Sequence, residues 1–137
     1  MAEALPAKHR FARWRGGVGM LVRGELGKRV IEKVVDKSGL GRYAGCVLRG
    51  NDGEHLVVIA TYRVGAATGD GTLFQRQSAH FRSEGRSCIH PTKCFLRDLG
   101  TLVKGWKRRG WKVVIGGDFN PTLWEGSTHG SRLADKY

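Results

Sequence analysis

The clearest pattern of apolar and polar positions is a pair of apolar segments, Tyr43–Arg49 and His55–Arg63, around the turn sequence Gly50-Asn51-Asp52-Gly53. An Asp-Gly step readily adopts the positive φ angles of a tight turn between two strands. The pattern therefore predicts an antiparallel β-hairpin. The centre of its second arm, Leu56–Thr61, is apolar at consecutive positions, which is typical of a central strand with both faces covered.

A second pattern, with helical spacing, begins at Pro91. Apolar residues recur there at steps of three and four, which places them in one stripe along a helix. Pro91 suits the first turn, basic residues suit the last turn, and Gly110 suits the position after it. The stripe consists of Phe95, Leu96, Leu99, Leu102, Val103 and Trp106. The next apolar segment, Trp111–Ile115, predicts a short strand that is also buried on both faces.

Four further segments complete the outline. Gly17–Arg23 is a short apolar run entered through glycines, which predicts a buried strand. Lys28–Asp36 fits a helical period as well, but its β-branched residues favour a strand. Gly65–Gly71 predicts a loop, and Thr72–Glu84 predicts a short polar helix. Strands, then helix, then a buried strand predict an α/β (α+β) domain with a mixed sheet.

Length and composition are those of one globular domain. The chain has 137 residues, and no window approaches the ~18 consecutive apolar residues that a membrane span needs. The basic N-terminal segment, residues 1–15, lacks the apolar run of a secretory signal. We divide the chain into this segment and a domain over residues 16–137.

The three cysteines, Cys46, Cys88 and Cys94, are odd in number and lack a Cys-x-x-Cys spacing. Such usage is typical of reduced thiols in an intracellular protein, nuclear or cytoplasmic. His80 and His90 lie near the last two cysteines, but the spacing matches no standard zinc site. We therefore expect no zinc there, and no obligate protein partner is identifiable.

The net charge bears most directly on the class of ligand. Lys and Arg number 24 against 12 Asp and Glu, a formal net charge of +12. A field of this sign attracts polyanions, nucleic acid first and an anionic membrane second. The alternative is a basic surface that only confers solubility. The cluster Lys107-Arg108-Arg109 between Trp106 and Trp111 is open to both interpretations: aromatic stacking on nucleic acid, or a solvated helix end.

The candidate chemistry follows the last predicted strand, in Gly116-Gly117-Asp118-Phe119-Asn120. Side chains alternate along an extended chain, so Asp118 and Asn120 are expected on one side, with Phe119 pointing into the core. A carboxylate beside a carboxamide suits Mg²⁺ or Mn²⁺, which prefer oxygen ligands. The alternative is an ordinary turn, because the same residue types are common in turns.

Three segments in order, Gly16–Val22, Leu56–Arg63 and Val113–Asn120, resemble the endonuclease/exonuclease/phosphatase superfamily, which includes deoxyribonuclease I-like and retrotransposon endonucleases. The Gly-Asp-Phe-Asn sequence after an apolar strand carries the resemblance most specifically. The resemblance implies a β-sandwich of two packed sheets flanked by helices. It also implies that Asp118 aligns or deprotonates a water and that Asn120 binds the phosphate or a metal-bound water. Tyr62 resembles a phosphate-contacting tyrosine of abasic-site enzymes; the alternative is a core aromatic.

Two departures from that family stand out. Its metal-binding Glu lies some thirty residues before the glycine segment, where this chain offers only Glu3, which is too close. Its closing Ser-Asp-His segment has no counterpart, because Asp135 precedes Lys136 and His129 precedes Gly130. We therefore expect a domain incomplete at both ends, weak or inactive alone, because acid–base and metal catalysis each contribute about 10² or more.

The resemblance implies Mg²⁺- or Mn²⁺-dependent phosphodiester hydrolysis on nucleic acid, DNA more than RNA, with catalytic Asp118, Asn120 and Tyr62 and metal-binding Asp118 and Asn120. One alternative is a catalytically inactive domain that binds polyanions. Another is a phosphatase or phospholipid hydrolase of the same superfamily.

Overall fold

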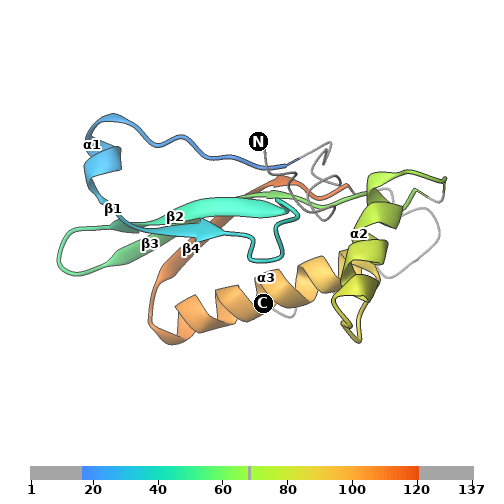
Figure 1. The fold of residues 1–137 in the computed structure, drawn as a ribbon. Helices are drawn as coiled ribbons and strands as arrows, with labels where there is room; N and C mark the ends of the chain where they lie inside the picture. Colours follow the sequence, from blue (N-terminus) through green and yellow to red (C-terminus); the bar gives the residue numbers. More distant parts are fainter. Residues whose placement is uncertain (1–16, 68, 121–137) are drawn as a thin grey trace, which may run out of the picture.

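The computed structural model describes residues 17–67 and 69–120. In chain order, as labelled in Figure 1, the elements are α1 (Gly24–Lys28), β1 (Val30–Val35), β2 (Tyr43–Arg49), β3 (His55–Tyr62), α2 (Leu73–Ser83), α3 (Pro91–Arg108) and β4 (Lys112–Asp118). The predicted basic segment 1–15 and residues 121–137, which include His129 and Asp135, lie outside the described residues.

The strands form one mixed sheet in the order β1-β2-β3-β4. β1 with β2 and β2 with β3 pair antiparallel, whereas β3 and β4 pair parallel. A parallel pair needs a long crossover, and α2 and α3 supply it. The predicted mixed α+β organisation is confirmed. The second sheet that the family resemblance implies is not among the elements of the described residues.

The hairpin is confirmed, with the predicted turn between β2 and β3. Asp52 and Gly53 adopt positive φ angles of 56° and 79°, and the Gly50 N–H donates to the Glu54 carbonyl across the turn. The strands predicted over Lys28–Asp36 and Trp111–Ile115 are present as β1 and β4. The helix predicted over Thr72–Glu84 is present as α2, and the ends of all three elements differ from the prediction by one to three residues. Short-range turn and periodicity signals therefore fixed these elements.

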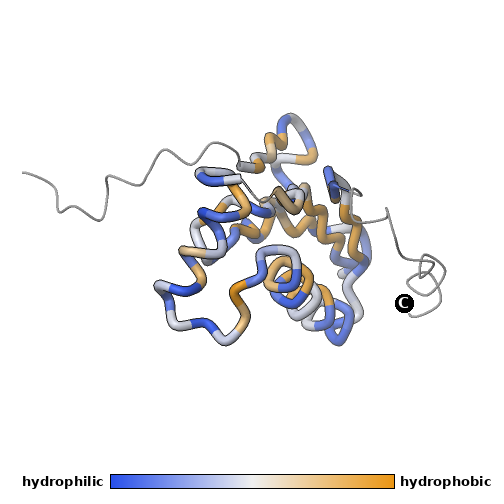
Figure 2. Tube along the Cα trace, turned by 90° about the vertical axis from the view of Figure 1, so that its right-hand side faces the viewer, coloured by the Kyte–Doolittle hydropathy of each residue, from blue (hydrophilic) through white to orange (hydrophobic). Residues whose placement is uncertain are grey.

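Helix α3 covers one face of the sheet (Figure 1). Its buried residues Phe95, Leu99 and Trp106 pack with Val57 and Ile59 of β3 in the main core. Hydrophobic colouring in Figure 2 accordingly gathers in the middle of the molecule. The predicted stripe is confirmed at these positions, but Leu96 is 54% exposed and lies outside the core.

The predicted strand Gly17–Arg23 is wrong. These residues adopt no helix or strand, and Leu21 is 88% exposed. One backbone hydrogen bond, from the Val18 N–H to the Gly41 carbonyl, ties the segment to the chain, and the Met20 and Cys46 sulfur atoms lie 3.9 Å apart. An apolar run becomes a strand only where a partner strand offers a ladder, and this segment has none among the described residues.

The prediction that β3 and β4 are buried on both faces is also wrong in part. β3 is central, as predicted, but its burial alternates along the strand. β4 is an edge strand of the sheet that the described residues form, and Val114 is 54% exposed. One face of the sheet packs against α3, whereas the other is covered only in part within the described residues.

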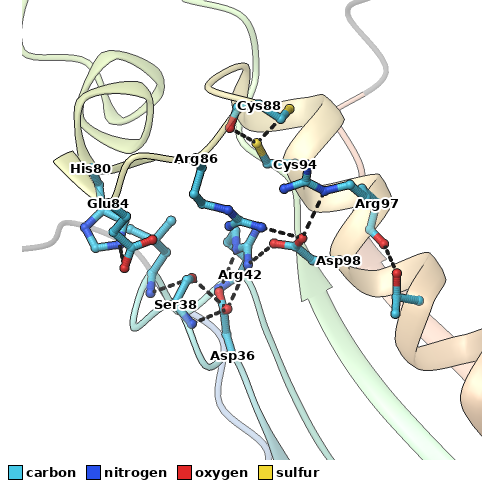
Figure 3. Close-up of polar contacts among 12 residues, drawn as sticks. Asp36, Ser38, Arg42, His80, Glu84, Arg86, Cys88, Cys94, Arg97 and Asp98 are labelled. Atoms are coloured by element: carbon cyan, nitrogen blue, oxygen red, sulfur yellow. Dashed lines mark hydrogen bonds and ion pairs between the residues drawn. The ribbon is translucent and has the colours of Figure 1, made fainter. Parts of the chain in front are cut away.

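A buried charge cluster joins the first strands to the helices (Figure 3). Arg42 pairs with Asp36 at 2.7 Å and with Asp98 of α3 at 2.9 Å, and Arg86 also pairs with Asp98 at 2.7 Å. Burial alone would raise the pKa of Asp36, but hydrogen bonds from Arg42 and Ser38 outweigh it and lower the pKa to about 2. Burial alone would lower the pKa of Arg42, but its carboxylate partners Asp36 and Asp98 outweigh burial and raise that pKa.

No helix in the described part of the chain combines the length and hydrophobicity that crossing a membrane requires.

Candidate functional site

The predicted site residues meet where β3 and β4 end. Tyr62 is the register partner of Asp118 in the parallel ladder, and the Arg63 N–H donates to the Asp118 carbonyl at 2.8 Å. Parallel strands end at the same edge of a sheet, where ligands of open α/β sheets usually bind. The fold therefore brings together two candidates that lie 56 positions apart in the sequence, Tyr62 and Asp118.

Gly117 is required by the strand pairing itself. A Cβ at this position would collide with the carbonyl oxygen of Thr61, and the φ angle of +149° is one that other residues rarely adopt. A Cβ at Gly116 would meet nothing within 4 Å. Gly117 therefore allows β4 to close onto β3 beside Asp118.

Asp118 and Asn120 do not lie on one extended strand as predicted. The strand ends at Asp118, and Asn120 has a φ angle of +42°. The Asp118 Oδ1 accepts the Asn120 N–H at 2.8 Å, which is an Asx turn. Phe119 reaches the core only in part: it is 40% exposed, with its ring centroid 6.4 Å from that of Phe95. The turn alternative thus describes the backbone correctly, while leaving the side-chain chemistry open.

Arg63 and Asn120 hold the two strand ends together. The Arg63 Nη2 donates to the Asn120 carbonyl at 2.6 Å, and the Asn120 Nδ2 donates to the Arg63 carbonyl at 2.6 Å. These bonds leave the Asn120 Oδ1 as the amide atom available to a ligand. The Asp118 carboxylate is exposed and keeps Oδ2 without a partner in the described residues.

Arg63 is a site residue that the sequence pattern did not indicate. Its Nε is buried and has no hydrogen-bond partner among the described residues. A buried, unpartnered donor of a guanidinium group is costly unless something accepts from it, and an anion would do so. The available signal was its position as the cation directly after Tyr62 at a strand end.

An open hollow of about 430 Å³ adjoins the strand ends. Tyr62 and Asn120 line it, together with the loop after β3 and the first turn of α2. The remaining lining residues are Val64, Gly65, Ala66, Ala67, Leu73 and Phe74. A small phosphate-bearing group therefore has room beside both candidate side chains.

The donor set at this site suits a hard divalent cation of modest affinity. Asp118 and Asn120 supply two oxygen donors, and Mg²⁺ commonly keeps several waters beside one or two protein ligands. No group of three or more His, Cys, Asp or Glu that could hold a metal occurs in the described residues. The metal ligands proposed from the sequence remain a prediction.

The remaining candidates are separate from this site. Cys88 and Cys94 lie 2.9 Å apart, whereas His80 pairs with Glu84 and His90 packs on Phe74. Trp106 is buried, so it is a core residue and cannot stack on bases.

In the comparisons with known proteins, no family model matches the chain, and no curated protein or solved structure is significantly similar to it.

Proposed function

We propose that the ends of β3 and β4 carry the site of a Mg²⁺- or Mn²⁺-dependent phosphodiesterase that acts on nucleic acid. The observation that carries the proposal is the pairing of Asp118 with Tyr62 at one sheet edge, with Arg63 and Asn120 beside them. Carboxylate, amide, phenol and guanidinium groups are the types that phosphoryl transfer uses for positioning and charge stabilisation.

Each side chain has a role that its surroundings support. The exposed Asp118 carboxylate orients a water or accepts its proton. The Tyr62 hydroxyl donates to the phosphate group, the Asn120 Oδ1 binds the divalent cation or a water on it, and Arg63 compensates the negative charge of the phosphate. The divalent cation, when bound by Asp118 and Asn120, acts as a Lewis acid on phosphate oxygens. The fold proposed with this function is the deoxyribonuclease-like sandwich, in which the four-stranded sheet would form one of the two layers.

Nucleic acid is the proposed substrate because the net charge is +12. A surplus of that size on a small domain favours a polymer of phosphates over a single small phosphate ester. The alternative substrates, a phosphomonoester and a phospholipid, are distinguished by the experiment below.

The test is plasmid nicking at high protein concentration with Mg²⁺ or Mn²⁺. The proposal predicts slow nicking that Asp118→Asn abolishes and Asn120→Ala reduces by about 10²-fold or more. Asp52→Asn, a matched change on the exposed hairpin turn, should leave the rate unchanged.

Binding without any Asp118-dependent cleavage would contradict the proposal and favour the inactive polyanion-binding alternative. Asp118-dependent turnover of a phosphomonoester or of phospholipid vesicles, without nicking, would reassign the substrate.

A further inference from the structure

Helix α3 carries a stripe of cations on the side opposite its buried residues. At 3.6 residues per turn, five exposed basic residues fall within an arc of about 100°, and the core residue Trp106 lies on the opposite side. The residues of this stripe, called the α3 basic stripe below, are Lys93, Arg97, Lys104, Lys107 and Arg108.

The α3 basic stripe is not neutralised by nearby carboxylates. Asp98 is the one acidic residue of α3, and its carboxylate is held by Arg42 and Arg86. Arg97 lies 3.6 Å from that carboxylate, and the other four cations have no ion pair among the described residues. The positive charge of the stripe is therefore open to an external anion.

The dimensions of the stripe suit a regular polyanion. From Lys93 to Arg108 the helix rises about 22 Å at 1.5 Å per residue. One strand of a duplex presents a phosphate about every 3.4 Å along its axis, so roughly six phosphates span the same length. A helix lying in an anionic membrane would need several apolar side chains beside its cations, but Leu96 is the one large apolar residue of α3 that is exposed, whereas Phe95, Leu99 and Trp106 are buried against the sheet.

We propose that the α3 basic stripe is a docking surface for the phosphate backbone of a nucleic acid duplex. The stripe reaches the catalytic end of the sheet, because Phe95, two residues after Lys93, packs against Phe119 beside Asp118. The inference rests on the proposed function for the identity of the polymer. It adds a non-catalytic surface that holds the duplex.

The test compares two triple variants with the same loss of charge. K93Q/K104Q/R108Q removes stripe cations, whereas R23Q/K37Q/R49Q removes exposed cations elsewhere. Affinity for a labelled duplex of about 20 base pairs is measured in EDTA, between about 50 and 200 mM salt.

We expect the stripe variant to lose more than about tenfold in affinity at low salt, and its log–log salt slope to fall by up to about 2.7 for three lost phosphate contacts. The control variant should stay within about threefold of wild type, by the same counterion argument. Equal losses in both variants would overturn the proposal in favour of a diffuse field.

Two further measurements separate this inference from the proposed function. In an Asp118→Asn background the stripe substitutions should cause the same fold-loss of duplex affinity as in wild type, because the stripe is distinct from the site. If nicking depends on Asp118 but the stripe variant binds the duplex as well as the control variant does, the docking proposal is refuted and the proposed function is not. Vesicles that contain phosphatidylserine provide the last arm: a stripe-dependent loss on vesicles but not on the duplex would assign the surface to lipid.

A second inference rests on an independent observation, the Cys88–Cys94 pair (Figure 3). Their sulfur atoms lie 2.9 Å apart, and the Cys94 Sγ also lies 2.8 Å from the Cys88 carbonyl oxygen. Cys94 is fully buried in the first turn of α3 beside Leu40 and Phe81, whereas Cys88 is half-buried in the preceding loop. Burial raises the pKa of Cys94 to about 11, so the more accessible Cys88 is the thiol that reacts first.

We infer that Cys88 and Cys94 form an intramolecular disulfide with each other when they react with a low-molecular-weight disulfide, such as oxidised glutathione, which acts as the oxidant. The Cys88 thiolate attacks the reagent, forms a mixed disulfide and releases one glutathione thiolate. The Cys94 sulfur then attacks Cys88 and releases the second. The protons of both cysteines end on the two glutathione thiols, which also gain the two electrons that the protein loses.

Intact-mass measurement after incubation with oxidised glutathione tests the inference. Wild type and Cys46→Ser should each lose two hydrogens and carry no adduct on this pair. Cys94→Ser should stop at a glutathione adduct, and Cys88→Ser should not react at this site. A stable glutathione adduct on Cys88 of wild type, or no reaction at either cysteine of the pair, would contradict the inferred Cys88–Cys94 disulfide.

Discussion

Replacement of Asp36 by Asn tests the buried charge cluster that holds the strands to α3. The Asp36 carboxylate accepts two hydrogen bonds from Ser38 and three from Arg42, and its side chain is 1% exposed. The Asn amide would keep one oxygen acceptor but turn its N–H donors toward the donors of Ser38 or Arg42, and it would leave Asp98 as the one carboxylate paired with the guanidinium among the described residues. Breaking a buried pair in this way costs about 3–5 kcal/mol, so Asp36→Asn should lower the free energy of unfolding by that amount at pH 7.

The pH dependence gives an independent magnitude. The pKa of Asp36 is lowered from 3.8 to about 2 in the folded chain. A lowered pKa stabilises the folded state fully above the unfolded value and loses that contribution as pH falls through the folded value. The shift corresponds to about 2.5 kcal/mol, lost between about pH 4 and pH 2.

Urea unfolding of wild type, Asp36→Asn and the exposed control Asp52→Asn, from pH 7 down to pH 2, measures both effects. The gap in stability between wild type and Asp36→Asn should narrow by about 2 kcal/mol below pH 4. If Asp36→Asn is within about 0.5 kcal/mol of wild type at pH 7, or if the gap is independent of pH, the reasoning about this cluster is refuted.

Three more predictions concern the sheet end, the core and the charge. Gly117→Ala should lower the free energy of unfolding by about 3 kcal/mol or more, because the added Cβ meets the Thr61 carbonyl and the φ angle is positive. Gly116→Ala should change the free energy of unfolding by less than about 0.5 kcal/mol. Equal effects in urea unfolding would contradict the described strand pairing. Phe95→Ala should cost about 3–5 kcal/mol, and Leu96→Ala on the exposed side of the same helix should be nearly neutral; the reverse order would place α3 wrongly. Duplex affinity should fall far more than about twofold from 50 to 200 mM salt, and a smaller change would remove charge as the basis of binding.

Local sequence signals predicted the hairpin and the helix α3. The partners of each segment, and the contacts between segments, depend on the tertiary structure. The Asp52-Gly53 turn and the α3 stripe were readable because their requirements lie within a few consecutive residues. The segment Gly17–Arg23 was misread, since apolar character alone does not reveal whether a strand has a partner. The Arg42 cluster could not be predicted, because its members come from separate segments that only the fold brings together.

The candidate site shows the same division. The sequence indicated Asp118, Asn120 and Tyr62, and the parallel register brings Tyr62 next to Asp118. It did not indicate that Asn120 turns away from the extended path or that Arg63 locks it in place. Both features depend on the contact between two strand ends that are remote in sequence.

The central claim is that these strand ends bind a divalent cation and a phosphate at one place. Paramagnetic Mn²⁺, substituted for Mg²⁺, broadens the backbone amide signals of residues near it, and this can be followed by nuclear magnetic resonance without turnover. The account predicts early broadening at Asp118, Phe119 and Asn120, extending to Arg63, and its loss in Asp118→Asn. Broadening that instead centres on Asp52 and Glu54 of the hairpin turn, or that survives unchanged in Asp118→Asn, would contradict it.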